Sequence, residues 1–304
     1  MVKKTDITGI PVDFRAGKTR VCGDIIEVRR YLHLSDSMAI QKIDAEHYMV
    51  KSTGEILEFK KSQNRSESRY QMSVTFGNMR AIVNSNFSGG TNQSLVTLTY
   101  RENMTDEKRL YEDFRKFRQK LERSIGYRLS YLAAVEPQCR GAWHLHVLYK
   151  RADGQTLYIP QKELLRLWGH GGVNVKRLKD VDNVGAYLSA YLMNLNVEEV
   201  EPDPAGEERE AETGQTDSKR YRKGERLGLY PPGMNFYRYS RDLKKPDWKS
   251  LGELSDKEKA IVRSAQPVYR KAQMIQEDDE ILQIVEYTQY NMARQNLKAD
   301  TTQI

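Results

Sequence analysis

The alternation of apolar and polar positions is clearest in the middle of the chain, from residue 94 to residue 194. Residues 94–100 (SLVTLTY) alternate β-branched and apolar side chains as a strand does, and residues 105–123 repeat apolar side chains at the spacing of an amphipathic helix. Extended over the whole stretch, the same reading predicts strands at 94–100, 128–136, 142–149 and 173–178, and helices at 105–123, 160–168 and 181–194.

These elements occur in the order β-α-β-β-α-β-α, which is typical of an α+β fold built on a ferredoxin-like antiparallel sheet, and we expect its helices on one face. The flanks are less regular. Residues 1–40 show little periodicity, residues 41–90 contain short strand patterns, and residues 256–297 are mostly helical in pattern. The sequence therefore predicts an α+β domain at 91–197, with an N-terminal extension at 1–90 and a C-terminal one.

Charge divides the chain at residues 198–217, where nine acidic residues accompany a single Arg209. A segment so rich in Glu, Pro and Gly buries little apolar surface, so we expect a disordered linker there, followed by a basic, aromatic and then helical region at 218–304. The whole chain has a net charge of +7, which leaves +15 outside the linker. This surplus favours a polyanionic partner such as nucleic acid.

The two cysteines, Cys22 and Cys139, lie far apart and give no reason to infer a disulfide framework. No apolar run approaches the length of a membrane span, and the N-terminus lacks the pattern of a secretory signal. We therefore expect a cytoplasmic protein.

Two histidines stand two residues apart in the predicted strand at 142–149, as His144-Leu145-His146. Side chains at i and i+2 of a strand project from one face, so the two imidazoles lie side by side. Glu136, near the end of the preceding strand, is expected to add a carboxylate oxygen, and two nitrogens with one oxygen suit a divalent cation. The alternatives are a structural or surface role for the histidines and, for Glu136, an ordinary strand-end acid beside Arg140.

Tyr187 and Tyr191 are four residues apart in the predicted helix at 181–194, so both phenols project from one side of it. Such a pair is often amphipathic packing, and Leu188, Leu192 and Leu195 form an adjacent apolar stripe. A phenol can also attack phosphorus when a nearby cation neutralises the phosphate.

The strand TLTY (97–100), the His-Leu-His strand with Glu136 upstream and the paired-tyrosine helix, in this order, resemble the HUH-endonuclease superfamily, specifically the rolling-circle replication initiators (Rep proteins) of plasmids and single-stranded phages. The resemblance covers about residues 95–194. It implies an endonuclease that binds Mg²⁺ or Mn²⁺, nicks one DNA strand at an origin, and leaves a 5′-phosphotyrosine and a free 3′-OH.

Carried over by position, His144 and His146 match the metal-binding motif, Glu136 matches a frequent third ligand, and Tyr187 matches the nucleophile. Tyr191 resembles the second tyrosine of the two-tyrosine subgroup, which starts a cycle with one tyrosine and resolves it with the other. One departure concerns the lysine that often follows these tyrosines as Tyr-x-x-Lys, because Ala190 and Asn194 occupy those positions here. We expect a substitute cation from the preceding segment: Lys176, Arg177 or Lys179.

The expected substrate is single-stranded or extruded origin DNA, held by basic and aromatic side chains of residues 226–246, among them Arg238 and Arg241. Residues 15–19 (RAGKT) end like a phosphate-binding loop, but Val12 replaces the glycine that such a loop requires. Strand separation is therefore assigned to a host helicase and extension to a host polymerase. The region at 1–90 is a further candidate for DNA binding, and the C-terminal region for self-association.

Several other functions remain open. A relaxase or transposase of a mobile element shares the same chemistry, and a catalytically weakened DNA-binding regulator would explain the charge and the missing lysines. A cupin-like metal enzyme also places His-x-His on a strand, but its later histidine is matched here only by His170, in a glycine-rich turn.

Overall fold

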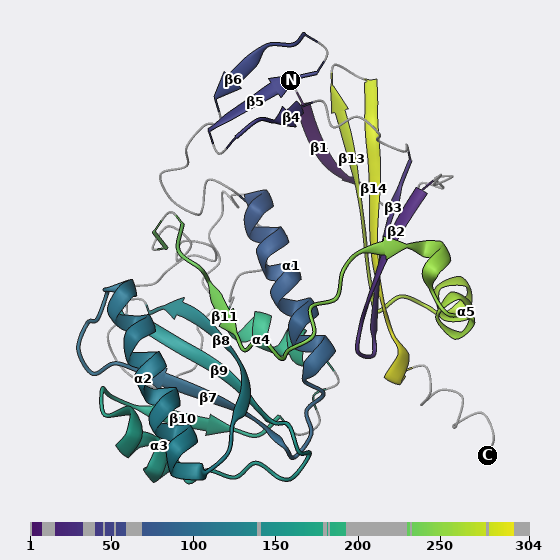
Figure 1. Ribbon diagram of the computed structural model, residues 1–304. Helices are drawn as coiled ribbons and strands as arrows, with labels where there is room; N and C mark the ends of the chain where they lie inside the picture. Colours follow the sequence, from purple (N-terminus) through teal and green to yellow (C-terminus); the bar gives the residue numbers. More distant parts are fainter. Residues whose placement is uncertain are drawn as a thin grey trace, which may run out of the picture. The chain divides into compact units, whose positions relative to one another are not determined.

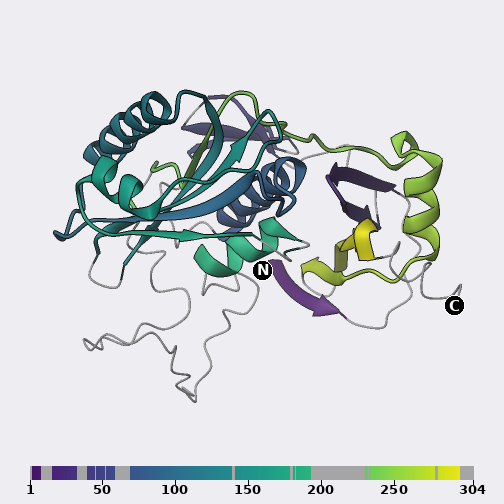
Figure 2. The same ribbon diagram turned by 90° about the horizontal axis from the view of Figure 1, so that it is seen from below.

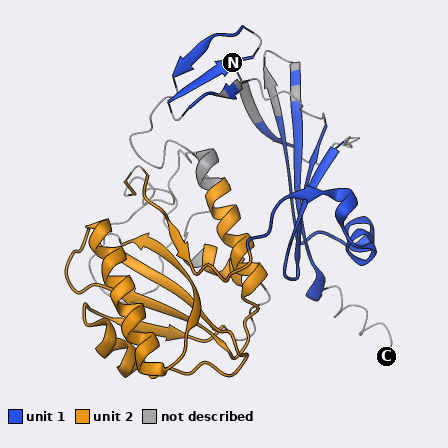
Figure 3. Cartoon of the chain, in the orientation of Figure 1, with its two compact units in different colours: residues 1–61, 245–304 blue, residues 62–244 orange. Residues whose placement is uncertain are grey.

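The computed structural model describes residues 2–7, 16–32, 40–44, 46–51, 53–58, 69–138, 141–178, 181, 183–192, 230–231, 233–277 and 280–294. The chain forms two compact units (Figure 3). The central unit comprises residues 62–244, and the terminal unit combines residues 1–61 with residues 245–304. The units thus divide the chain at other residues than the compositional boundaries at 90 and 197. The predicted linker at 198–217 lies outside the described residues.

The central unit is built on an antiparallel sheet with the strand order β10-β7-β9-β8-β11 (Figure 1). Its elements follow one another as β7 (Gln93–Thr99), α2 (Glu107–Ile125), β8 (Leu129–Pro137), β9 (Trp143–Arg151), α3 (Gln161–Trp168), β10 (Val173–Lys176) and α4 (Val184–Leu192). This order confirms the predicted β-α-β-β-α-β-α series and the α+β class. The sheet places the first predicted strand between the fourth and the third, which is the ferredoxin-like arrangement.

Two further elements complete the central unit. Helix α1 (Arg69–Asn86) precedes β7 in a region where the sequence pattern predicted short strands. Strand β11 (Tyr237–Tyr239) comes from the basic, aromatic segment beyond the predicted linker and pairs with β8 at the sheet edge. The C-terminal part of the chain therefore contributes directly to the sheet that carries the histidines.

Helices cover both faces of this sheet (Figure 2). On one face, Phe114 of α2 contacts Tyr131 of β8 edge to face, with a ring-centroid distance of 5.5 Å. On the other face, Nζ of Lys150 donates to the carbonyl oxygen of Asn86, the last residue of α1, at 2.7 Å. Helix α4 packs along α1 and so lies on the Lys150 side. The expectation that all helices share one face is therefore wrong for α4, because α1, unpredicted, provides a packing partner on the opposite side.

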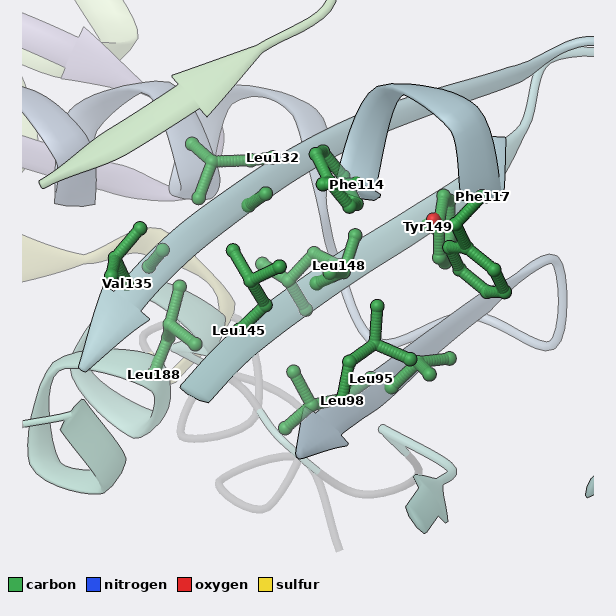
Figure 4. Packing of buried hydrophobic residues seen from close by; sticks show 14 of the residues in the cluster. Leu95, Leu98, Phe114, Phe117, Leu132, Val135, Leu145, Leu148, Tyr149 and Leu188 are labelled. Atoms are coloured by element: carbon green, nitrogen blue, oxygen red, sulfur yellow. The ribbon is translucent and has the colours of Figure 1, made fainter. Parts of the chain in front are cut away.

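The core of the central unit is continuous through the sheet. Leu95, Leu148 and Leu132 are register partners on three adjacent strands and are buried (Figure 4). Helix α2 buries the four residues of its predicted apolar stripe, Leu110, Phe114, Phe117 and Leu121. It begins at Asp106, whose side chain accepts from the backbone N–H groups of Lys108 and Arg109, and it ends at Gly126 in the left-handed conformation (φ 78°).

The terminal unit contains an antiparallel sheet of strand order β1-β13-β14-β3-β2-β12. Its strands are β1 (Val2–Ile7), β2 (Ala16–Cys22), β3 (Ile25–Tyr31), β12 (Lys249–Ser250), β13 (Tyr269–Glu277) and β14 (Glu280–Asn291). The short helix η3 (Leu251–Glu253) and α5 (Asp256–Ser264) pack on one face, where Leu254, Ile261 and Val262 meet Ile26, Val28 and Tyr290. A small separate sheet contains β4 (Ile40–Lys42), β5 (His47–Val50) and β6 (Ile56–Glu58).

Two sequence predictions fail in the terminal unit. The pattern at 256–297 predicted mostly helix, but α5 is followed there by the long strands β13 and β14. Residues 1–40 showed little periodicity, yet they supply β1, β2 and β3. Strand β2 includes residues 16–19 of the loop-like RAGKT segment, consistent with its exclusion as a phosphate-binding loop. No helix within the described ranges is long and apolar enough to cross a membrane.

Candidate active site

The β-sheet register brings the predicted ligands to one face of the central unit. His144 of β9 lies between Thr99 of β7 and Glu136 of β8, and these cross-strand partners project from the same face. His146, two residues further along β9, pairs with Thr97 of β7 and projects from that face too. We call this side of the sheet the histidine face. The alternation predicted from the sequence thus places both histidines and Glu136 on one surface.

Glu136 and His146 are in direct contact. Oε2 of Glu136 lies 2.8 Å from Nε2 of His146, and the His146 side chain is almost fully buried at 2% exposure. The other ring nitrogen, Nδ1, lies 3.2 Å from Oγ1 of Thr97. Both imidazole nitrogens therefore have defined partners on neighbouring strands, which fixes the plane of the ring.

This chain of contacts defines two proton arrangements. When Glu136 is ionised and accepts from Nε2–H of a neutral imidazole, Nδ1 is left to accept from the Thr97 hydroxyl. When a cation binds Nε2, that nitrogen must be unprotonated, so Nδ1–H donates to Oγ1 of Thr97 instead. Thr97 is able to serve both arrangements because a hydroxyl is both donor and acceptor.

His144 stands slightly apart from this pair. Its ring centroid lies 6.2 Å from that of His146, and the two ring planes are inclined by 60°. Among the residues that the structure describes, no group of three or more His, Cys, Asp or Glu side chains is arranged to hold a metal ion. Glu136 and His146 alone fit one in geometry, because two neighbouring ligands about 2.1 Å from an octahedral cation are roughly 3 Å apart. The donor types fit a divalent cation, and His144 adds a third donor of the right kind on the same face.

Helix α4 carries both tyrosines and is tightly seated against α1. The backbone N–H of Gly185 donates to Oδ1 of Asn84 at 2.7 Å. A Cβ atom on Gly185 would lie 2.6 Å from that oxygen and 2.9 Å from the carbonyl oxygen of Arg80. Only glycine permits so close an approach of the two helices. The position of α4 over the histidine face is therefore set by its second residue.

The buried side of α4 is formed by Val184 and Leu188, which are both at most 1% exposed. Tyr187 is partly buried and packs beside this stripe against the core. On a helical projection, Val184 and Leu188 lie between the stripe of Gly185, which meets α1, and that of Tyr187. Tyr187 thus lies on the side of α4 away from α1. The side chain of Tyr191 lies outside the described residues, although its backbone is within α4.

The predicted DNA-binding cations lie at different places in the unit. Lys176 is exposed and pairs with Leu95 at the edge strand β10, which puts it on the histidine face. Arg177 follows it and is exposed, and Lys179 is outside the described residues. Arg238 lies on the α2 side, with Cζ 3.5 Å from the Tyr111 ring centroid.

Arg241 stands in the turn after β11, next to Asp242, which accepts from Oγ of Ser130. Ser130 lies near the start of β8, whereas Glu136 lies near its end. The structure therefore brings neither Arg238 nor Arg241 to the Glu136–His146 pair, and Lys176 is the predicted cation that shares their face.

Two residues of the TLTY segment have roles that the sequence reading missed. Thr97 orients His146, and the signal was present, because Thr97 and Thr99 alternate on β7 as His144 and His146 do on β9. Tyr100 is buried, and its hydroxyl donates to Oδ2 of Asp113 at 3.1 Å. Burial, together with the charge of Asp113, raises the pKa of Tyr100 far above its usual value. Tyr100 is thus a structural residue and unsuited to act as a nucleophile.

One comparison with known proteins bears on this arrangement. Residues 93–196 match the model of a family described as replication-associated protein, of the ORF2 type. No curated protein and no solved structure is significantly similar to the chain. The match runs from the first residue of β7 past the end of α4, so it contains Glu136, both histidines and both tyrosines. Over this third of its length, the chain is similar to replication-associated proteins, which supports a Rep-like role in DNA replication.

Proposed function

We propose that the protein initiates rolling-circle replication by nicking single-stranded origin DNA, with a tyrosine of α4 attacking the scissile phosphate above the histidine face. The observation that carries the proposal is the buried pair of Glu136 and His146, with Nε2 and Oε2 2.8 Å apart, on the sheet face that α4 also covers. The match of residues 93–196 to a replication-associated family supports it independently.

The reaction is a transesterification in which the number of phosphodiester bonds stays constant. The phenol oxygen of Tyr187 forms a bond to phosphorus, and the bond from phosphorus to the 3′-oxygen breaks. The phenol proton is lost and the departing 3′-oxygen gains one, so the products are a 5′-phosphotyrosine and a free 3′-OH. The DNA strand remains activated for rejoining, because a later 3′-OH can displace the tyrosine without ATP. Tyr191 is the candidate for that second step.

Glu136, His146 and His144 would hold Mg²⁺ or Mn²⁺ for this reaction. Bound there, the cation would neutralise a non-bridging oxygen of the scissile phosphate. The protein's own part is to present Nε2 of His146 in a fixed direction, through the contact of Nδ1 with Thr97. The +15 net charge outside the acidic segment supplies the attraction for the DNA backbone.

This proposal also assigns the partners. A host polymerase extends the 3′-OH, and a host helicase separates the strands, since the chain carries no recognisable helicase motif. Relaxases and transposases that use the same chemistry remain the nearest alternatives.

The test uses single-stranded oligonucleotides that tile the DNA carrying the gene, labelled at either end and incubated with Mn²⁺. A 3′ label is expected to migrate with the protein in denaturing gels, and a 5′-labelled fragment should be extended by a polymerase. The adduct should be lost in Tyr187→Phe, in Tyr191→Phe or only in the double variant, which assigns the nucleophile. An adduct that persists in the double variant contradicts the proposal.

A second candidate function is a DNA-binding regulator without nuclease activity. It is favoured by the spacing of His144 from the Glu136–His146 pair and by Ala190 and Asn194 in place of lysines. Sequence-specific DNA binding with no adduct in Mg²⁺, Mn²⁺, Co²⁺ or Zn²⁺ would select the regulator.

A further inference from the structure

We propose that the terminal unit holds a second binding surface for single-stranded DNA, centred on Trp248. The proposal extends the proposed function, because it gives the nicking unit a separate contact with the same substrate strand. The surface lies on the sheet of β2, β3 and β14 and is formed by Trp248 together with Lys18, Arg20, Arg29, Lys245, Lys249 and Tyr287. We call it the Trp248 surface.

Trp248 lies across two guanidinium groups. Cζ of Arg20 is 4.5 Å from the indole centroid, and Cζ of Arg29 is 4.3 Å from it. Arg20 of β2 pairs with Glu27 of β3, and Arg29 lies two residues beyond Glu27, so the two arginines project from the same face of adjacent strands. The indole is therefore supported from beneath by two cations, and its ring remains only partly buried.

The base of the surface is rigid. Arg20 is 3% exposed, and its Nε donates to Oε2 of Glu27 at 2.8 Å. Gln289 of β14 donates from Nε2 to the Tyr287 hydroxyl at 2.6 Å. Arg29 also faces the Tyr287 ring, with its Cζ 5.8 Å from the centroid. Guanidinium and aromatic groups thus alternate across three strands, which are seen side by side in Figure 1.

The charge around Trp248 is mainly positive. Lys18, Lys245 and Lys249 are exposed, and Lys249 and Lys18 come from the paired strands β12 and β2. Against these cations stand Glu27, which is paired with Arg20, and the exposed Asp247. The opposite face of the sheet is apolar and is covered by η3 and α5. The terminal unit as a whole is close to neutral, so its cations are concentrated here rather than spread evenly.

The chemistry of this surface favours single strands over duplex. An indole held flat on a sheet can stack with an unpaired base, whereas the bases of a duplex are covered by their neighbours. The surrounding lysines suit phosphates on either side of a stacked base. A peptide partner would require apolar pockets or an unpaired strand edge, and the described part of this face offers cations and aromatic rings instead.

The experiment measures fluorescence anisotropy of a labelled dT20 oligonucleotide with the full chain. The protein carries Tyr187→Phe and Tyr191→Phe and is kept in EDTA, so that no adduct forms and binding is separated from nicking. The test variant is Lys18→Ala with Lys249→Ala. Its control is Lys257→Ala with Arg263→Ala, which removes the same charge from exposed positions of α5 in the same unit.

We expect the Lys18/Lys249 variant to bind dT20 more weakly and the control to bind as the parent does. The slope of log K against log salt should become shallower by about 1.4, or about 0.7 for each lost phosphate contact. Trp248→Ala should weaken binding about tenfold or more, and Trp248→Phe should keep much of it because a phenyl ring also stacks. Circular dichroism melting of each variant checks the fold.

Equal affinities of the two charge variants overturn the proposal, as does equal binding of dT20 and a duplex of the same length. Neither result affects the nicking test, which depends on the tyrosines. Conversely, dT20 binding that depends on Trp248 in a protein that forms no adduct would support this surface while contradicting the proposed nuclease.

Discussion

The hydroxyl of Thr97 lies 3.2 Å from Nδ1 of His146, and Nε2 of the same ring is thereby directed at Glu136. If His146 is a metal ligand, Thr97 is a positioning residue that accepts Nδ1–H and keeps Nε2 available. Replacing Thr97 by Val preserves the shape of the side chain but removes the hydroxyl, so we expect Mn²⁺ affinity to fall about 10- to 100-fold, as measured by calorimetry.

Thr97→Ser is the matched control, because it keeps the hydroxyl and should retain most of the affinity. Nitrogen-15 NMR of the histidine rings provides a readout without DNA. With a diamagnetic cation such as Mg²⁺ bound, the parent should show His146 protonated at Nδ1, and Thr97→Val should show a mixture of tautomers. Equal Mn²⁺ affinity and unchanged His146 signals in Thr97→Val would contradict a positioning role.

Glu136 offers a test of whether the pair is a metal site or an ordinary ion pair. Glu136→Gln retains an oxygen that can accept from Nε2 of His146 but removes the negative charge, so the fold should persist. We expect Mn²⁺ affinity to fall at least tenfold and the rate of adduct formation to fall with it. Urea unfolding checks stability. If the variant binds Mn²⁺ as tightly as the parent, Glu136 is only a strand-end acid beside His146.

The central sheet was predictable because local patterns coincide with tertiary packing. Each predicted strand and helix between residues 93 and 192 appears, since the apolar stripes of α2 and α3 and the alternation of β7 match the faces they bury. Strands β13 and β14 escaped prediction. Residues 269–291 carry long polar side chains on the open face of a two-faced sheet, so their apolar positions are too sparse to reveal the period of two.

The site was predictable in kind but only partly in geometry. Spacing alone places His144 and His146 on one face, and the hairpin brings Glu136 beside them. Spacing does not decide that Glu136 contacts His146 rather than its register partner His144, because this depends on side-chain rotamers. The position of α4 was equally inaccessible, since it depends on contact with α1, whose residues are distant in the sequence.

Gly185 tests whether the seating of α4 matters for activity. In Gly185→Ala the new Cβ would lie 2.6 Å from Oδ1 of Asn84, so α4 must shift away from α1. We expect a loss of about 1–3 kcal/mol in the free energy of unfolding, measured in urea, and a slower adduct formation. Gly77→Ala in α1 is the control, because its Cβ would meet nothing within 4 Å. That variant should gain about 0.4–1 kcal/mol. A Gly185→Ala protein as stable and active as the parent would contradict the packing argument.

Lys176 and Arg238 separate the two faces of the central sheet. Lys176 is exposed on the histidine face, whereas Arg238 lies over the Tyr111 ring on the α2 side. A strand whose phosphate reaches the Glu136–His146 pair can contact Lys176 without crossing the sheet. We expect Lys176→Ala to slow adduct formation severalfold, with a smaller effect at high salt because the interaction is with phosphate. Arg238→Ala should leave the adduct rate within twofold and instead lower stability by about 0.5–1 kcal/mol through loss of the cation–π contact. Both single variants remove one positive charge, so their difference measures position rather than net charge. A slower reaction in Arg238→Ala than in Lys176→Ala would place the DNA on the α2 side and contradict attack above the histidine face.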